Sequence, residues 1–422
     1  MAKKVAEDWA NLLMNEKTKI TLDHRHSSVI LQGDDGNGGI LGENDFRVNI
    51  NRLTEQTFAL GTGAAVCYLE NANIDEYGNL GYSPEAKIKI DWLAADNIIP
   101  LSWQQDRLRE AAFISDVVLH GDKFAYLQVH RLEEDSYVIT SHFFKENDFS
   151  YKEVSLPSGI ARTVRTGNDT PWFTIFKPNI VNSLFPDLPM GISVFAGCKD
   201  ILKGIDLCYD SLNMEFYLGK KMVFLRKDLL SEDEEGYLYA PQDSNKQLFM
   251  YIGDKTMDGD MIPKEFNPTL RVDAHTAALQ QQLNYLAGKC GFGENHYRFD
   301  GSSVATATQV ISENSNLFRS VKKHEIALES QIVSFARGIL TIARDFIGRR
   351  VLPDCRIAVC FDDSIIEDMA TMQRRDLELL DAGVMQKWEF RQKYFGEDEK
   401  TAKKIIRETI KETITETEKE RN

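Results

Sequence analysis

The sequence lacks most of the motifs by which an enzyme or a metalloprotein is recognised. Its six cysteines among 422 residues are widely spaced, with no CxxC pair and no histidine spacing that would frame a zinc site. It has no GxxxxGK[ST] loop for nucleotide phosphates and no GxSxG motif. We therefore expect a cytosolic protein with reduced, mostly buried thiols, and no enzyme: no catalytic residue, no cofactor and no bound metal.

The sequence is also poor in positive charge. Fifty lysines and arginines against 65 aspartates and glutamates give a net charge of −15, which argues against the basic surface of an ordinary nucleic-acid-binding protein. Any contact with DNA must be local or loose. The first residues, MAKKVAEDWANLLMNEK, lack the apolar core of a signal peptide, and we find no window near the roughly 18 apolar residues of a membrane span. We therefore expect no membrane insertion.

The most prominent feature that is present is one very long helical pattern. Apolar residues recur at steps of three and four from Val304 to Ile347 and so lie along one face of a helix. Such a helix would be roughly 65 Å long, whereas a compact globule of this chain length would be about 55 Å across. Either the helix kinks, or the subunit is elongated and the polar members of the stripe, Thr308, Ser315 and Glu325, face a neighbour or water.

The first half of the chain predicts two helices and then antiparallel β-structure. Helices are expected over residues 3–17 and 44–56, with a polar loop at 32–42 between them. Apolar alternation predicts strands at Ala65–Leu69, Lys87–Trp92, Arg109–Ser115, Phe124–Leu132, Ser136–Phe144 and Lys152–Leu156. The proline-rich segment 158–188 predicts an irregular connector across the surface.

The second half predicts two helices that bracket a small insert. Helices Ile192–Tyr217 and Ala274–Lys289 have apolar stripes, and the insert holds strands at Met222–Arg226 and Gln247–Ile252. This order suggests an antiparallel helical pair with a small unit at its tip. After a strand at Arg356–Phe361 the tail is expected to be helical over 367–381, 387–394 and from 399 onward.

Two glycine-rich segments resemble ligand-binding loops only in part. Gly61-Thr-Gly63 has the opening of a dinucleotide-binding fingerprint, but neither its third glycine nor the long helix follows, which favours structural glycines in a β turn. Asp34–Gly39, DDGNGG, lacks the alternating oxygen ligands of a calcium loop, which favours a flexible polar loop.

Two further groups could take part in metal chemistry. Asp23, His24 and His26 could bind a metal with another ligand from elsewhere, but their alternation favours polar residues on an exposed strand. Asp362 and Asp363 follow an apolar strand, where the metal-binding carboxylates of nucleases often lie. They also lead directly into a predicted helix, so helix capping is the favoured interpretation.

One exposed cluster mixes histidine, aromatic and basic groups. It lies in the loop Cys290–Gly301 between two predicted helices and comprises Glu294, Asn295, His296, Tyr297 and Arg298. Cationic and stacking side chains are those that contact a phosphate backbone or bases. The cluster therefore fits a nucleic-acid contact. The alternative is that Tyr297 and Phe299 pack against a neighbouring subunit.

The order of these elements resembles the portal proteins of tailed bacteriophages, in particular the portal family of siphophages that infect Gram-positive bacteria. The resemblance spans nearly the whole chain. It is carried by the motifs at Ala2–Glu7, Leu60–Gly63, Asp96–Pro100, Gly301–Val310, Lys323–Glu325, Phe361–Ile366, Asp381–Gly383 and Tyr394–Gly396. None of these motifs is catalytic, and their order is more specific than any one of them.

The resemblance implies a ring-forming α+β portal fold with wing, stem, clip and crown. Its parts would be residues 1–190 as the wing (helices plus antiparallel β-structure), 191–217 and 274–289 as stem helices, 218–273 as the clip, 290–303 as the tunnel loop, 304–347 as the long kinked wing helix, 348–362 as a wing strand, and 363–422 as the helical crown.

The function that this resemblance implies is a homododecameric ring at a unique capsid vertex, the channel for packaging and ejection of double-stranded DNA. Its partners would be the terminase large subunit, head-completion and adaptor proteins, and the major capsid and scaffolding proteins. The protein would be assembled in the host cytoplasm, reside in the virion, and form rings of twelve, or in isolation thirteen, subunits.

Specific residues and an overall charge follow from the resemblance. The tunnel-loop residues Glu294–Arg298 would contact DNA. The acidic run of the clip would dock terminase and adaptors, through Ser231, Glu232, Asp233, Glu234 and Glu235. A dodecamer would carry a charge of about −180, and an acidic channel repels phosphate and so suits sliding. The alternatives are a metal-dependent packaging nuclease that uses Asp362 and Asp363, and a capsid scaffold that does not handle DNA.

Overall fold

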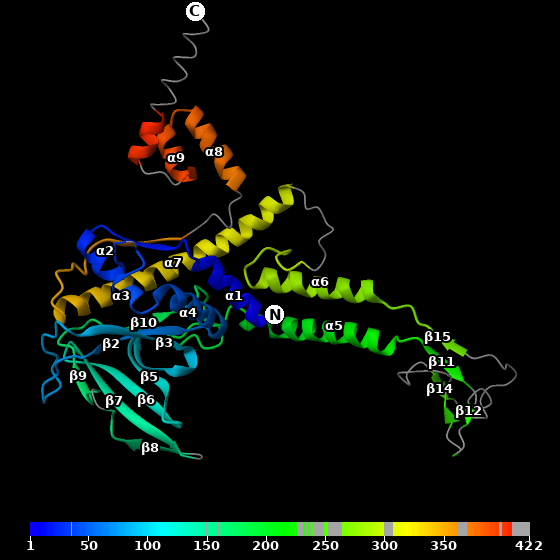
Figure 1. The fold of residues 1–422 in the computed structure, drawn as a ribbon, viewed down its shortest axis with the longest axis horizontal. Coiled ribbons are helices and arrows are strands. Elements are labelled where there is room, and N and C mark those ends of the chain that lie inside the picture. The colour runs from blue at the N-terminus through cyan, green and yellow to red at the C-terminus, as the bar shows by residue number, and fades with distance from the viewer. Residues whose placement is uncertain are drawn as a thin grey trace, which may run out of the picture. The chain divides into compact units, whose positions relative to one another are not determined.

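The computed structural model describes residues 1–34, 36–147, 150–157, 160–225, 231–232, 235, 238–239, 249–251, 264–298, 307–361, 369–395 and 399–406. The chain divides into two compact units, Met1–Cys360 and Phe361–Asn422. Its helices and several separate sheets make it a mixed α+β protein, which confirms the predicted class (Figure 1).

The N-terminal region of unit 1 is more helical than the sequence predicts. Its elements are α1 (Ala2–Leu13), β1 (Lys19–Leu22), α2 (Arg25–Gln32), α3 (Gly39–Gly42) and α4 (Phe46–Leu60). The expected helix over 3–17 is too long, because the Asn15 side chain accepts the backbone N–H of Lys17 at 2.9 Å and turns the chain. The expected loop at 32–42 is partly wrong, since α3 lies within it.

Two antiparallel sheets form the β-rich part of unit 1. The three-stranded sheet has the order β10-β2-β3, with β2 at Gly63–Glu70, β3 at Lys87–Ala94 and β10 at Phe173–Phe176. The six-stranded sheet contains β4 (Ile98–Gln104), β5 (Arg107–Leu119), β6 (Asp122–Glu133), β7 (Ser136–Asn147) and β8 (Ser150–Val154), and β9 (Thr163–Arg165) also pairs with β7. A short 3-10 turn, Ala95–Asn97, joins the two sheets.

The structure confirms the six predicted strands and adds three. β4 escaped prediction because it contains Pro100, which an edge strand next to a bulge accepts. β9 and β10 lie in the segment expected to be an irregular surface connector. That expectation is wrong for β10, because it pairs with β2 and its residues Phe173 and Phe176 are 5% and 2% exposed.

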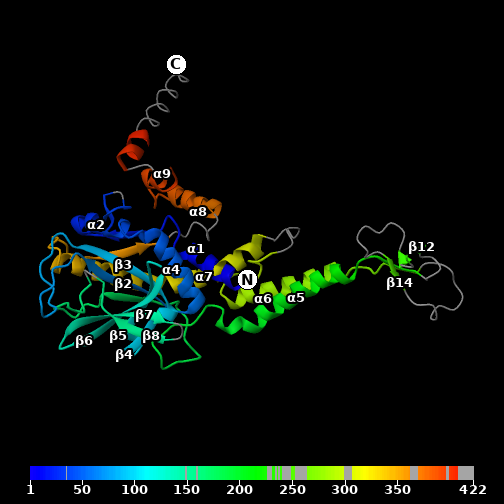
Figure 2. The same ribbon diagram turned by 60° about the horizontal axis from the view of Figure 1, so that its bottom comes forward.

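The main core of unit 1 has three layers. One face of the three-stranded sheet packs on the six-stranded sheet through Val66, Leu93, Phe113 and Phe173. Its other face is covered by α4 and by α7 (Ala307–Asp345). There the centroid of the Phe335 ring lies 6.0 Å from that of Phe46 and 5.7 Å from that of Trp92. Figures 1 and 2 show these helices beside the sheets.

The helix α7 is a single α-helix of 39 residues, about 58 Å long at 1.5 Å per residue. Its predicted stripe is buried from Val321 onward, for example at Ile332 and Ile339, which are fully buried. Glu325 is also buried and pairs with Lys322 of the same helix at 2.9 Å, so the expectation that it faces water or a neighbour is wrong. The predicted start at Val304 lies outside the described residues, as do the side chains of Thr308 and Ser315.

The same helix shows that one expectation is wrong, namely that no window is apolar enough for a membrane span. Its segment Asn316–Asp345 is long and apolar enough to cross a membrane. An 18-residue window within the segment has a mean hydropathy of 1.3, and half of that window is buried inside the fold. The core helix of a soluble protein has the same properties. Charged residues interrupt the apolar ones along this segment, so no continuous apolar run marks it in the sequence.

Two helices, α5 (Lys199–Leu218) and α6 (Val272–Lys289), lie side by side in both views and are called the helical pair (Figures 1 and 2). A 3-10 turn, Ala196–Cys198, precedes α5. The predicted start at Ile192 is too early, because the backbone N–H of Val194 donates to Phe58 at 3.0 Å and holds this segment against α4.

Small strands lie between the two helices in the sequence and near the end of unit 1. The first group consists of β11 (Met222–Leu225), β12 (Ser231–Glu232), β13 (Leu238–Tyr239), β14 (Phe249–Tyr251) and β15 (Lys264–Phe266), so strands occur at both predicted places. The second is β16 (Ile357–Cys360), which pairs antiparallel with β1 and closes the N-terminal region against the end of the unit.

Unit 2 is helical in its described residues, as predicted. It contains α8 (Met369–Asp381), α9 (Lys387–Phe395) and a helical segment at 399–406. The buried Asp376 accepts hydrogen bonds from Lys393 Nζ at 2.5 Å and Tyr394 Oη at 2.8 Å, which ties α8 to α9. Asp362 and Asp363, the candidate metal ligands, lie outside the described residues.

Candidate functional site at the root of the helical pair

The helical pair is antiparallel and is fastened at both ends. At its root, the Sγ atoms of Cys198 and Cys290 are 3.9 Å apart, and both side chains are buried. At its far end, Arg271 Nη2 donates to Glu215 Oε2 at 2.8 Å. The Arg271 guanidinium and backbone N–H lower the pKa of Glu215 to about 2. The two helices therefore form one element rather than two independent ones.

The loop after α6 turns back onto the body of unit 1. Phe292 stacks on Trp9 of α1 with ring centroids 4.8 Å apart, and Trp9 Nε1 donates to the carbonyl of Cys290 at 3.1 Å. Gly291 has a φ of +89°, and a Cβ there would lie 3.2 Å from Ser320 Oγ and 3.3 Å from the Trp9 ring. A glycine is therefore required where this loop leaves α6.

Two of the predicted DNA-contacting residues are held by one carboxylate of α1. Tyr297 Oη donates to Asp8 Oδ2 at 3.0 Å, and His296 Nε2 lies 3.5 Å from the same atom. Burial, together with Asp8, raises the pKa of Tyr297. Burial lowers the pKa of His296, and the opposing effect of Asp8 is smaller. The loop is thus an ordered part of the fold, with its aromatic face turned to its own chain.

The other three predicted residues differ in their surroundings. Asn295 is half-buried, with its side chain 3.5 Å from that of Asn284 on α6. Glu294 and Arg298 are exposed. Tyr297 hydrogen-bonds to its own α1 and is half-buried in the single chain, and packing against a neighbouring subunit stays a prediction. Phe299 and the rest of the loop up to Ser303 lie outside the described residues, and contact with DNA stays a prediction.

No pattern in the sequence indicates the aromatic cluster behind this loop. The imidazole of His324 lies 4.7 Å from the Trp9 ring and 4.9 Å from the Phe58 ring, and its Nδ1 accepts the backbone N–H of Asn179 at 3.1 Å. Burial lowers the pKa of His324 to about 4, so it is neutral at physiological pH. These residues are far apart in the sequence, and no local pattern connects them.

The acidic run predicted to dock partners is described only in part. Ser231 and Glu232 form β12, which pairs antiparallel with β13, and Glu235 is exposed. Asp233 and Glu234 lie outside the described residues. The described part of the run therefore belongs to a short antiparallel pair of strands, and its docking role stays a prediction.

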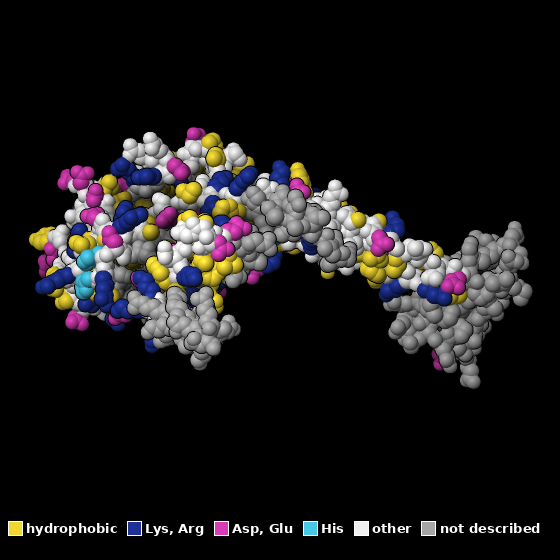
Figure 3. Space-filling view, turned by 90° about the horizontal axis from the view of Figure 1, so that it is seen from above, with side chains coloured by type: hydrophobic (Ala, Val, Ile, Leu, Met, Phe, Trp, Pro, Cys, Tyr) yellow, Lys and Arg dark blue, Asp and Glu magenta, His cyan; other side chains and the backbone are white. Residues whose placement is uncertain are grey.

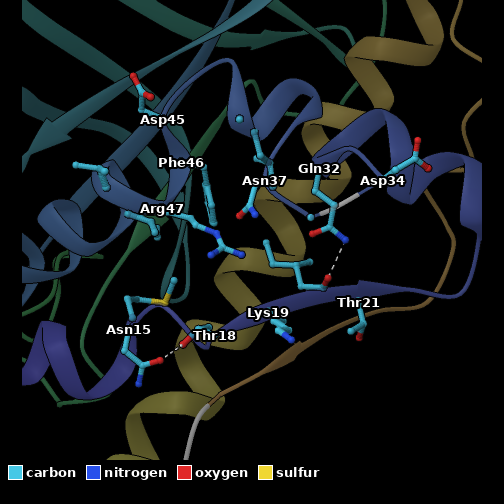
Figure 4. Close-up of a pocket in the computed structure, with 17 residues that line it drawn as sticks. Asn15, Thr18, Lys19, Thr21, Gln32, Asp34, Asn37, Asp45, Phe46 and Arg47 are labelled. Atoms are coloured by element: carbon cyan, nitrogen blue, oxygen red, sulfur yellow. Dashed lines mark hydrogen bonds between the residues drawn. The ribbon is translucent and has the colours of Figure 1, made fainter. Parts of the chain in front are cut away.

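The segment Asp34–Gly39 borders a separate pocket of about 450 Å³ beside β1 and α4. Figure 4 shows Arg47 pointing toward Asn37 and Gln32, whereas Asp34 and Asp45 point away from the pocket. Gln32 Nε2 already donates to the carbonyl of Ile20 at 2.9 Å. Among the described residues of this segment and pocket, the carboxylates of Asp34 and Asp45 therefore do not converge as a calcium loop would need.

Asp23 and His24, two of the three candidate metal ligands near β1, make structural hydrogen bonds. The three candidates do not lie on a strand, because β1 ends at Leu22; that expectation is wrong. The backbone N–H of Ser27 donates to His24 Nδ1 at 3.2 Å, which caps α2, and Asp23 Oδ1 accepts the backbone N–H of Arg356 at 3.0 Å. Among the described residues, no three metal-ligating side chains come together.

Gly61-Thr-Gly63 is structural, as predicted, but it is not a β turn. Gly61 ends α4 with a φ of +92°, and a Cβ there would lie 2.7 Å from the backbone of Ile192. Thr62 Oγ1 accepts the backbone N–H of Gly191 at 2.9 Å, and Gly63 begins β2. Gly61 therefore allows the irregular segment that leads to α5 to pass close to the end of α4.

No protein-family model matches the sequence, and no curated protein matches it.

Proposed function

We propose that this chain is a bacteriophage portal subunit, which assembles into a dodecameric ring around a channel for double-stranded DNA. The observation that carries the proposal is the exposed apolar surface of the helical pair. In the single chain, Leu207 is 66% exposed, Tyr217 65% and Leu218 62%. Contiguous apolar surface on a folded protein marks an interaction site, because burying it against a partner is favourable.

The apolar stripe of α5 changes character along its length. Its first residues, Ile201 and Ile205, are buried in the chain itself, whereas Phe216 near its end is 49% exposed. Figure 3 shows hydrophobic side chains in patches along the helical pair, between charged ones. A ring of identical subunits would cover this surface on every copy through the same contact.

The arrangement of elements also supports the proposal. A β-rich region, a helical pair around small strands, a loop, a very long helix, one strand and a helical tail follow one another in the order of the portal resemblance. We infer that the helical pair is the stem, that β11 to β15 belong to the clip, and that unit 2 is the crown. The terminase and the head-completion proteins would dock on the clip.

The ring is tested by the mass of the purified full-length protein near neutral pH, with native mass spectrometry or mass photometry. We expect closed rings, mostly of twelve or thirteen subunits. The double variant Leu207→Glu/Leu218→Glu should give monomers or small oligomers, because each glutamate would bury a charge in the interface. Val118→Glu is the matched control, since Val118 on β5 is equally exposed at 65%.

The result also separates the other candidate functions. A stable wild-type monomer at micromolar concentration would argue against a portal, and metal-dependent DNA cleavage by that monomer would favour the nuclease. Rings that assemble but neither package nor retain DNA within capsids would favour a scaffold.

A further inference from the structure

A cavity of about 580 Å³ lies between the three-stranded and the six-stranded sheet. Ligand pockets in proteins commonly measure roughly 300–1,000 Å³. The cavity begins where the apolar core of the two sheets ends. Leu93 on β3 belongs to that core, and Asp91, two residues earlier on the same face of the strand, lines the cavity.

The cavity is polar at positions that a packed sheet normally fills with apolar side chains. On the six-stranded sheet, Ser115 pairs with Tyr126 across β5 and β6, and Gln128 pairs with Ser141 across β6 and β7. All four line the cavity, and both Gln128 and Ser141 are buried. The inner faces of both sheets therefore change together from apolar to polar.

These polar side chains are already ordered. Gln128 Nε2 donates to Tyr126 Oη at 2.9 Å, and Tyr126 Oη lies at the same distance from Ser141 Oγ. Asp91, in contrast, has neither a hydrogen bond nor an ion pair from its side chain among the described residues. Its burial raises the pKa of the carboxyl group. A partly buried carboxylate without a partner is costly to the fold.

The charge of the lining defines the ligand. Asp91, Glu70 and Asp116 all line the cavity, and the described lining residues include no lysine, arginine or histidine. Such a cavity rejects anions and attracts a cation. Trp172 also lines it, is 3% exposed, and has an indole N–H without a hydrogen-bond partner among the described residues.

We propose that this cavity binds a small organic ammonium ion, with Asp91 as its counter-ion. Tyr68 and Tyr126 also line the cavity, and aromatic rings attract an ammonium group through their faces. A charge-assisted hydrogen bond from the ammonium group would offset the free-energy cost of burying the Asp91 carboxylate. The proposal is independent of ring formation and of DNA transport.

Matched amines and alcohols test the proposal on the full-length protein. The probes are tyramine against 4-ethylphenol, and n-butylamine against n-butanol, so that each pair differs in its ammonium group. Dissociation constants would be measured by isothermal titration calorimetry or ligand-observed NMR at pH 7. We expect at least one amine to bind at least tenfold more tightly than its neutral counterpart.

Two variants assign this preference to Asp91. Asp91→Asn keeps the size of the side chain and should abolish the preference for the amine. Asp116→Asn removes an exposed carboxylate of the same lining and should retain most of the preference. The proposal would be overturned if the wild-type protein preferred neither amine. It would also be overturned if Asp91→Asn kept the full preference. Circular dichroism of both variants checks that they are folded.

Discussion

The thiol groups of Cys198 and Cys290 are in contact, with their Sγ atoms 3.9 Å apart, where α5 begins and α6 ends. They are buried, and the sequence separates them by 92 residues. The spacing is greater than the roughly 2.05 Å of a disulfide, so the two thiols are reduced. The contact fixes the root of the helical pair.

Mild oxidation should therefore convert this pair into a disulfide. With diamide as the oxidant, we expect the mass of the intact chain to fall by two hydrogens and dithiothreitol to restore it. Burial and the neighbouring Cys198 raise the pKa of Cys290, so the reaction should be slow at neutral pH and faster as the pH rises. Cys198→Ser should abolish the change. Cys208→Ser, on the same helix, should leave it intact, and a disulfide map without the 198–290 pair would contradict the prediction.

Replacement of His130 should stabilise the protein. His130 is fully buried beside Phe113 and Phe173, and neither ring nitrogen has a hydrogen-bond partner in the described part of the chain. His130→Leu removes two unsatisfied polar atoms and should raise the free energy of unfolding by about 1–3 kcal/mol in urea titrations. His142→Leu is the control, because His142 already has Glu153 as a partner at 3.0 Å and should gain nothing.

Acid should destabilise unit 1 through its two buried histidines. Burial lowers the pKa of His130 to about 3 and that of His324 to about 4, against about 6.5 in an unfolded chain. Below pH 6.5 the unfolded chain binds more protons, so the free energy of unfolding falls by about 1.4 kcal/mol per pH unit and histidine. Urea midpoints from pH 7.5 to 5 measure this loss. In His130→Leu, the slope of the free energy of unfolding against pH should correspond to about one bound proton fewer. An unchanged slope would show that His130 does not cause the acid sensitivity.

The hydrogen bond from Tyr297 to Asp8 should hold the loop after α6 on the body of unit 1. Tyr297→Phe removes only the hydroxyl group, leaves Asp8 without this donor, and should cost about 1 kcal/mol. Hydrogen exchange should show faster opening of residues 290–298. Tyr285→Phe is the control, since Tyr285 is 57% exposed on α6. If the loop is equally protected from hydrogen exchange in the wild type and in Tyr297→Phe, ring stacking alone is sufficient to hold the loop in place.

Alanine at both His296 and Arg298 tests the proposed DNA contact. We expect ring formation to be preserved and the amount of DNA packaged per capsid, or its retention, to fall, because two cationic or hydrogen-bonding groups are lost next to the phosphate backbone. Tyr297→Phe separates this effect from loosening of the loop. Normal filling and retention in the double variant would leave the loop with a purely structural role.

Local patterns predicted the elements well wherever one periodicity dominates a segment. The stripe through Ile332 and Ile339 placed α7, because a helix that must bury one face repeats its apolar residues every three to four positions. Polar contacts decided several boundaries instead. Asn15 ends α1 and His24 begins α2, and neither effect can be read from periodicity.

The sequence by itself determined the mixed α+β class, most helices and strands, and the acidic charge, since each depends on neighbouring residues or on composition. Only the tertiary structure decided the candidate sites. It brought Tyr297 to Asp8, Cys198 to Cys290, and Asp91 to the polar face of the opposite sheet. The physical reason is that contacts between distant segments follow from how several elements pack at once, and no stretch of sequence carries that information locally.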